Sequence, residues 1–120
     1  MEENSKIYQS GVQAMLEVFG GKWKILILYQ LFKGRKRTSE LRRSIPGITQ
    51  KVLTQQLRDL EKNELIHRID YIEIPPRVEY EISEYGYTLK DIIDRICLWG
   101  EDHLDRIYGD KNKVPEDHFK

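Results

Sequence analysis

The part of the sequence that most restricts the fold is a pair of helical segments joined by a short turn. The first segment covers residues 39–45, and Ser39 is a good N-cap for it. A Pro-Gly pair at 46–47 makes the turn. Thr49 is a good N-cap for the second segment, which extends to about Asn63 with leucines at helical spacing on one side. Two helices joined in this way predict a helix-turn-helix.

The segment that follows has the period of a β-hairpin. From residue 77 to 82, Val78, Tyr80 and Ile82 alternate with charged side chains, as in a half-buried strand. Residues 65–71 are expected to form its partner strand, and the two prolines at 75–76 suit the connecting loop because proline donates no backbone hydrogen bond. A hairpin directly after a helix-turn-helix is a wing. The sequence therefore predicts a recognition helix at about 49–63 and a wing at about 65–82.

Further helices flank this unit on both sides. Apolar residues recur at helical spacing from 12 to 19, and residues 22–32 are apolar on most sides, which places that helix at the centre of the fold. After the wing, Ser83 is expected to cap a long helix that ends near Tyr108. The predicted class is α+β, mostly α. Residues 1–120 form one domain, with a core at about 10–108 and a flexible tail at 109–120.

The last helix carries more apolar side chains than one small domain is expected to cover. Because the first helix also has an apolar stripe, we expect the terminal helices to form a two-fold homodimer. The two recognition helices would then lie about 34 Å apart, one turn of DNA. The alternative is that the last helix packs only on its own core. The residues expected at the dimer interface are Leu89, Ile92, Ile93, Ile96 and Trp99.

Charge is distributed unevenly although the formal net charge is zero. Residues 33–58 hold eight Lys and Arg and a single Glu, whereas residues 83–120 hold nine acids and six bases. A basic middle is typical of a chain that offers one face to phosphates, although basic runs also occur as plain solvated surface.

The outer side of the second helix in the pair has the side chains that read base edges. Gln pairs with adenine, Lys or Arg with guanine, and Thr contacts thymine in the major groove. The first two turns of a recognition helix normally point into that groove, and here they contain no acid. The alternative is an ordinary polar face. The predicted base-reading residues are Gln50, Lys51, Thr54, Gln55 and Arg58.

Basic side chains before and on the first helix of the pair are better suited to phosphates, which fix the register without choosing the sequence. Arg77 on the hairpin is an equally good ion-pair partner for Glu73 or Glu79, so its role stays open. The predicted phosphate-binding residues are Arg35, Lys36, Arg37, Ser39, Arg42, Arg43 and Arg77.

Patterns typical of enzymes, metal sites and membranes are missing from the sequence. The three histidines, His67, His103 and His118, are far apart, and no phosphate-binding glycine loop or nucleophile motif occurs. Cys97 is the only cysteine, which excludes an internal disulfide. No apolar run approaches about 20 residues and no secretory signal is found. We therefore expect a cytoplasmic protein that is not an enzyme and needs no metal, cofactor or membrane.

Six short motifs occur in one order over about residues 10–104, and together they resemble the HxlR-type regulators, which are bacterial winged-helix proteins related to the MarR group. The resemblance implies a sequence-specific DNA-binding transcriptional regulator, with repression as the expected effect, that acts as a homodimer on a pseudo-palindromic operator. The alternative is a winged-helix module whose main partner is a protein or a small-molecule effector. The motifs are GGKW at 20–23, SELRR at 39–43, IPGI at 45–48, VLTQQL at 52–57, PPRVEY at 75–80 and WG at 99–100.

The sequence departs from the family pattern at three places. Many members have a redox-sensing cysteine where this chain has Ser10, and serine forms neither a thiolate nor a disulfide. Cys97 is expected to be a packed residue and not a sensor. Thr38 stands where relatives often have Phe. Glu64 replaces the usual glycine after the recognition helix, so Asn63 is expected to take the left-handed cap.

Overall fold

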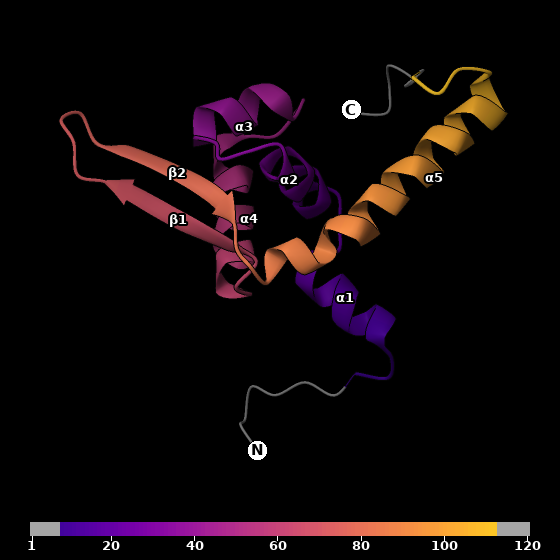
Figure 1. The fold of residues 1–120 in the computed structure, drawn as a ribbon, viewed down its shortest axis with the longest axis horizontal. Coiled ribbons are helices and arrows are strands. Elements are labelled where there is room, and N and C mark those ends of the chain that lie inside the picture. Colours follow the sequence, from indigo (N-terminus) through magenta and orange to yellow (C-terminus); the bar gives the residue numbers. More distant parts are fainter. Residues whose placement is uncertain (1–7, 113–120) are drawn as a thin grey trace.

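The computed structural model describes residues 8–112 and shows a winged helix-turn-helix, which confirms the predicted fold class (Figure 1). Of the predicted tail, residues 109–112 follow the last helix and residues 113–120 lie outside the described part. In chain order the elements are α1 (Gly11–Phe19), α2 (Trp23–Phe32), α3 (Thr38–Ser44), α4 (Gln50–Lys62), β1 (Ile66–Tyr71), β2 (Arg77–Ile82), the 3-10 helix η1 (Gly86–Leu89) and α5 (Lys90–Tyr108).

The core lies where α2, α3 and α4 meet the base of the hairpin. The helix predicted to be central, α2, buries Ile27, Leu28 and Leu31. The leucine stripe of α4 is buried at Leu53, Leu57 and Leu60. Each such side chain contributes about 1.5–3 kcal/mol on removal from water. The core therefore fixes α4 by one face and leaves the opposite face in solvent.

The two helix starts of the helix-turn-helix differ in their caps. Thr49 caps α4 as predicted, because its hydroxyl accepts a hydrogen bond from the backbone N–H of Val52 at 3.2 Å. The expected Ser39 cap is wrong, since α3 begins one residue earlier, at Thr38. Instead, the Glu40 carboxylate accepts from the backbone N–H of Arg37 at 2.8 Å. A carboxylate near a helix start also interacts favourably with the helix dipole.

The wing is an antiparallel pair in which Ile66 lies opposite Ile82 and Tyr71 opposite Arg77. A short segment before α3 joins it, because Lys36 exchanges both backbone hydrogen bonds with Tyr80, at 3.0 and 2.8 Å. The charged residues of β2 are half-buried, although simple alternation predicts them to be exposed. The bridge holds residues 35–37 beside the strand, where Arg35 contacts Glu81 and Arg37 contacts Glu79. It also ties the wing to the helix-turn-helix.

The chain leaves α4 through a left-handed residue, and that residue is Glu64, with φ 65°. The expectation that Asn63 takes this conformation is wrong, since its φ is −85°. The Leu65 N–H donates to the Leu60 carbonyl at 3.0 Å, and the Glu64 N–H donates to the Glu61 carbonyl at 2.9 Å. These are the two bonds of a Schellman motif, which requires the left-handed residue directly after the capping residue.

Replacing Glu64 by glycine is therefore expected to stabilise the protein by about 1 kcal/mol, because the left-handed region is unfavourable for a side chain with a Cβ. Urea unfolding followed by circular dichroism measures the free energy of unfolding. The matched control is Glu61→Gly inside α4, which should destabilise by about 1 kcal/mol. A loss of stability in Glu64→Gly would contradict this account of the turn.

The predicted long last helix is interrupted at its start. Ser83 does not cap it: its hydroxyl accepts from the Gly86 N–H at 2.8 Å and donates to the Glu64 carbonyl at 2.6 Å. This arrangement begins η1, and α5 starts only at Lys90. The 19 residues of α5 span about 28 Å and project away from the body (Figure 1). Within α5, the buried residue is Ile93.

Candidate nucleic-acid interface

The outer face of α4 brings together the five predicted base-reading residues. Four of them are exposed and Thr54 is half-buried. They line one shallow surface hollow together with Val52 and Gln56. Because the leucine stripe holds the opposite side of α4 against the core, this face is turned away from the core. The residues that share it are Gln50, Lys51, Thr54, Gln55 and Arg58.

Two glutamines on this face are held by side chains one turn further along the helix. The amide nitrogen of Gln50 donates to the Thr54 hydroxyl at 3.1 Å. The amide nitrogen of Gln55 donates to the Asp59 carboxylate at 3.1 Å. The other oxygen of Asp59 lies 3.5 Å from the Lys24 ammonium of α2. Sequence reasoning missed Asp59 and Lys24, although the four-residue spacing of Gln55 and Asp59 is a signal for the first pair.

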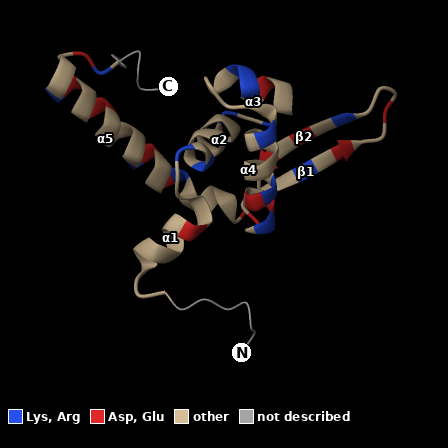
Figure 2. Ribbon diagram, turned by 180° about the vertical axis from the view of Figure 1, so that it is seen from behind, with Lys and Arg blue, Asp and Glu red and all other residues tan. Residues whose placement is uncertain are grey.

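Arg42 and Arg43 are exposed in the last turn of α3, and α3 packs next to α4 (Figure 2). Neither arginine forms an ion pair with another residue between 8 and 112, and the same holds for Lys51 and Arg58 on α4. Exposed cations without a partner are the groups that phosphates can neutralise. Ser39 is also exposed, in the first turn of α3.

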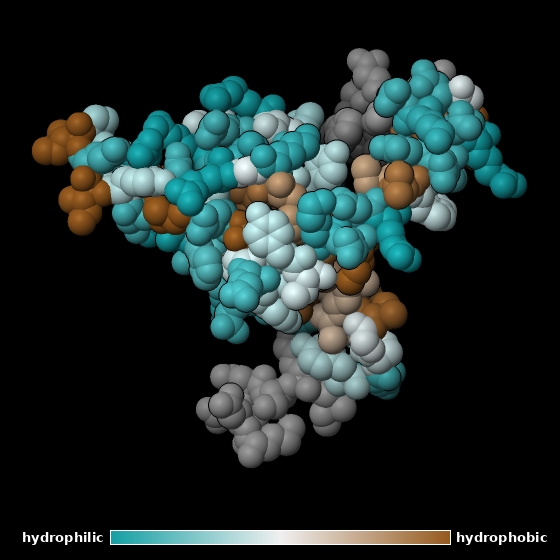
Figure 3. Space-filling model, in the orientation of Figure 1, coloured by the Kyte–Doolittle hydropathy of each residue, from teal (hydrophilic) through white to brown (hydrophobic). Residues whose placement is uncertain are grey.

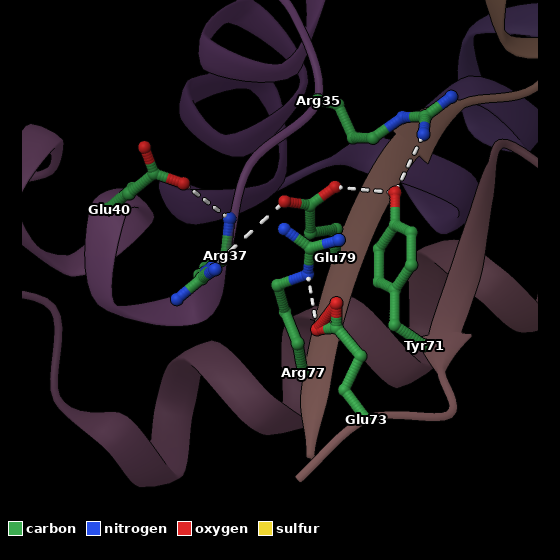
Figure 4. Close-up of polar contacts among 7 residues, drawn as sticks. All are labelled: Arg35, Arg37, Glu40, Tyr71, Glu73, Arg77 and Glu79. Atoms are coloured by element: carbon green, nitrogen blue, oxygen red, sulfur yellow. Dashed lines mark hydrogen bonds and ion pairs between the residues drawn. The ribbon is translucent and has the colours of Figure 1, made fainter. Parts of the chain in front are cut away.

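Arg35 and Arg37 are held by the wing (Figure 4). Arg35 donates to the Tyr71 hydroxyl at 2.8 Å and to the Glu81 carboxylate at 2.9 Å. These contacts, the one with Tyr71 first, raise the pKa of Arg35. Arg37 lies 3.9 Å from Glu79, which accepts from the Tyr71 hydroxyl at 2.9 Å. The structure thus ties two of the predicted phosphate-binding cations to carboxylates of β2.

Arg77 takes the ion-pair role that the sequence left open. Its guanidinium Nε lies 3.3 Å from the Glu73 carboxylate, and the guanidinium group lies 3.9 Å over the Tyr71 ring (Figure 4). Arg68 on β1 is paired in the same way with Asp70, at 3.3 Å. The wing therefore presents cations that carboxylates already accompany.

The terminal helices expose apolar side chains that the fold does not cover. On α5, Ile92, Ile96 and Trp99 remain 50%, 45% and 69% exposed, and α1 exposes Val12 and Leu16. Brown and tan patches are visible near the junction of these two helices (Figure 3). The other two residues expected at a dimer interface lie elsewhere. Ile93 is 2% exposed in the protomer's own core, and Leu89 packs against that core.

Ser10 and Cys97 both have structural contacts. Ser10 caps α1, since its hydroxyl accepts from the Gln13 N–H at 3.3 Å. Cys97 is half-buried in α5, and its thiol donates to Glu101 over 3.5 Å. Burial and this contact raise the pKa of the Cys97 thiol, which keeps it protonated at neutral pH.

Neither a metal centre nor a membrane span is found in the described part of the chain. Between residues 8 and 112, no three His, Cys, Asp or Glu side chains are grouped so that they could hold a metal ion. No helix in that range combines the length and the apolar character needed to cross a bilayer.

Comparison with known proteins gives one consistent result. The sequence model of the HxlR-like helix-turn-helix family matches residues 18–108. The chain is 56% identical over 112 residues to the uncharacterized HTH-type transcriptional regulator YtcD of Bacillus subtilis (strain 168), covering 93% of this chain and 89% of YtcD. A crystal structure of ytcD, 57% identical, superposes with a TM-score of 0.78 over 82% of this chain and all of that one. A MarR-family regulator from Enterococcus faecalis V583 is 40% identical, with a TM-score of 0.71 over 88% of this chain and 96% of its own.

Proposed function

The chain belongs to the HxlR-like helix-turn-helix family of transcriptional regulators, and we propose that it represses transcription as a homodimer on a pseudo-palindromic DNA operator. The family is a class of DNA-binding regulators and not a class of enzymes. The observation that carries the proposal is the outer face of α4. This face is largely exposed and has no acid in its first two turns, and the neighbouring helix α3 carries Arg42 and Arg43, which have no ion-pair partner between residues 8 and 112.

The reading face has a side chain for each kind of major-groove contact. Gln50 and Gln55 offer an amide edge that matches adenine, and Lys51 and Arg58 offer donors that match guanine. Thr54 provides a hydroxyl and a methyl group, which suit thymine. A helix of α4's width fits the major groove, and these side chains project from it over its first three turns.

Positioning on the phosphates comes mainly from α3. Arg42 and Arg43 on this helix are exposed and unpaired in the described chain. Lys36 and Ser39 remain secondary candidates. The arginines that the wing holds have first to leave a carboxylate before they can bind a phosphate. We therefore assign to Arg35, Arg37 and Arg77 the orientation of the wing.

The dimer that we propose uses the exposed residues of the terminal helices. Ile92, Ile96 and Trp99 follow one stripe of α5, and α1 adds Val12 and Leu16. We propose that an isologous contact through this stripe sets the two copies of α4 about 34 Å apart, the spacing of two operator half-sites one helical turn apart. Ile93 is not part of this interface because its own core covers it.

An effector-binding role has weaker support. An apolar hollow between α1 and η1 is lined by Met15, Val18, Phe19, Tyr85 and Leu89 among others. Its volume is about 200 Å³, below the range of about 300–1,000 Å³ that is typical of small-molecule sites. DNA binding through α4 is therefore the function that the geometry supports best.

The proposal is tested by two substitutions with different expected results. Arg43→Ala should weaken binding to every duplex alike, because it removes a phosphate contact. Gln55→Ala should instead reduce discrimination at one base pair of each half-site, by about 1–3 kcal/mol. Fluorescence anisotropy with duplexes selected from a random pool measures both quantities. If no duplex binds more tightly than millimolar at low salt, the proposal is wrong.

Salt dependence tests which cations take part. Two phosphate contacts per protomer, made by Arg42 and Arg43, predict that log Kobs falls by about 4 per log unit of salt for the dimer, at about 0.9 per contact. Participation of Arg35, Arg37 and Arg77 as well would raise the slope to about 9. A measured slope near the larger value would contradict our assignment of these three arginines to the wing.

A further inference from the structure

Asp59 is an acid next to a surface that we expect to approach DNA phosphates. A negative charge there weakens DNA binding, so its presence calls for a role that offsets this cost. Its carboxylate is shared between two contacts, one with the Gln55 amide at 3.1 Å and one with the Lys24 ammonium at 3.5 Å. The side chain of Lys24 is only 14% exposed. Asp59 is thus anchored to α2 on one side and reaches Gln55 on the other.

The chemistry of the carboxylate decides how the Gln55 amide is oriented. An ionised carboxylate only accepts hydrogen bonds, so the NH₂ group of Gln55, and not its carbonyl oxygen, must face Asp59. An amide nitrogen has two N–H donors. One can stay with Asp59 while the other N–H and the carbonyl oxygen form the edge that pairs with N7 and N6 of adenine.

The pair formed by Gln50 and Thr54 provides a contrast on the same helix. The Thr54 hydroxyl accepts from the Gln50 amide at 3.1 Å, but a hydroxyl can equally donate to the amide oxygen. The Gln50 amide can therefore turn over and keep a hydrogen bond. The Gln55 amide loses its hydrogen bond to Asp59 if it turns over. The two glutamines differ in the chemistry of their neighbour and not in their distance from it.

We infer that Asp59 is a positioning residue that fixes the Gln55 amide in the orientation that reads adenine and disfavours guanine. Guanine presents the acceptor O6 where adenine presents the N6 donor, so a glutamine whose amide turns over and brings its NH₂ group to that position can pair with guanine. Holding that group on Asp59 opposes this alternative. The inference rests on the proposed DNA-binding function and adds to it the residue that sets one base preference.

Asp59→Asn tests this role because it removes the charge with almost no change of shape. Asparagine can donate or accept, so the Gln55 amide becomes free to turn over. The readout is the ratio of dissociation constants for two operators that differ by A·T or G·C at the base pair read by Gln55. That base pair is the one at which Gln55→Ala loses its preference. The ratio should fall by about tenfold in Asp59→Asn, within the range of one bidentate contact.

A charge-matched control separates positioning from simple electrostatics. Glu61→Gln removes an exposed acid of the same helix two residues away, and it should tighten binding to both operators without changing their ratio. Asp59→Asn should tighten binding to the G·C operator and also change the ratio. The double variant Gln55→Ala, Asp59→Asn should show the same ratio as Gln55→Ala alone.

Each other outcome counts against the inference. Suppose that Gln55→Ala abolishes the preference for A·T but Asp59→Asn keeps the ratio of the original protein. This result would overturn the positioning role of Asp59 and leave the DNA-binding proposal intact. If Gln55→Ala changes no base preference, Gln55 reads no base and the role of Asp59 falls with it. If the original protein binds no duplex, the proposed function itself fails.

Discussion

Ile96→Asp is expected to convert the proposed dimer into a monomer. The Ile96 side chain is 45% exposed in the protomer and lies in the middle of the α5 stripe between Ile92 and Trp99. A dimer contact would bury the exposed part and gain about 1 kcal/mol per copy. An aspartate in that place loses this gain and leaves a carboxylate without a partner, which costs several kcal/mol more. Two-fold symmetry applies both effects twice.

Loss of the dimer should also reduce operator binding by a large factor. Two linked recognition helices bind the second half-site at a high effective concentration, and this gain is about 10²–10⁴-fold in typical bivalent systems. A monomer retains only one half-site. Sedimentation equilibrium at micromolar concentration measures the oligomeric state, and gel-shift titration on the same samples measures operator affinity.

Ile72→Asp is a matched control for the oligomeric state. Ile72 is fully exposed at the wing tip, which lies at the opposite end of the molecule from α5 (Figures 1 and 3). This substitution introduces the same charge on another apolar surface, so the dimer should persist. If Ile96→Asp still sediments as a dimer, the interface is elsewhere. If the unmodified protein is a monomer at this concentration, the dimer proposal is wrong.

Gly86→Val should destabilise the fold by about 3 kcal/mol, at the upper end of what overpacking usually costs. A Cβ at Gly86 would overlap the carbonyl oxygen of Leu65 and lie 2.9 Å from the Ile82 side chain. The Leu65 carbonyl cannot easily move aside because it accepts from the Ser83 N–H at 3.0 Å. A valine side chain therefore forces apart the segments that meet here, which are the ends of β1 and β2 and the start of η1.

Urea unfolding measures this effect against a glycine in open space. Gly11 is the first residue of α1, and a Cβ there meets no atom within 4 Å. Gly11→Ala should therefore keep or slightly raise the free energy of unfolding. A domain of this size has about 5–15 kcal/mol of stability, so the predicted loss in Gly86→Val is easily measured. Equal stability of Gly86→Val and the original protein would contradict the described packing.

Much of the fold follows from local patterns in the sequence. The leucine spacing of residues 53–60 identifies α4 and its buried side because helical geometry repeats every 3.6 residues. The alternation in residues 77–82 identifies β2 by the same kind of reasoning. Once the buried side of α4 is known, its opposite side must contain the reading face. The sequence alone therefore identifies the candidate base-reading residues.

Several details depended on contacts between segments that are distant in the sequence. The last helix begins at Lys90 and not at Ser83 as the sequence predicts, because the Ser83 hydroxyl binds the Glu64 carbonyl and the Gly86 N–H at the end of the wing. The structure also places Tyr71 and Glu81 beside Arg35, and these two contacts are not predictable from the sequence. No local pattern encodes such neighbours.

The sequence by itself determined which segments are helices and strands, where the turn of the helix-turn-helix lies, and which side chains face outward from α4. These properties depend on backbone geometry and the burial of apolar residues within each segment. The tertiary structure decided which of the outward-facing charges are paired. It pairs Arg35, Arg37 and Arg77 with carboxylates and leaves Arg42 and Arg43 unpaired in the described chain. Charge pairing depends on distances of a few ångströms across the fold, and sequence spacing does not fix those distances.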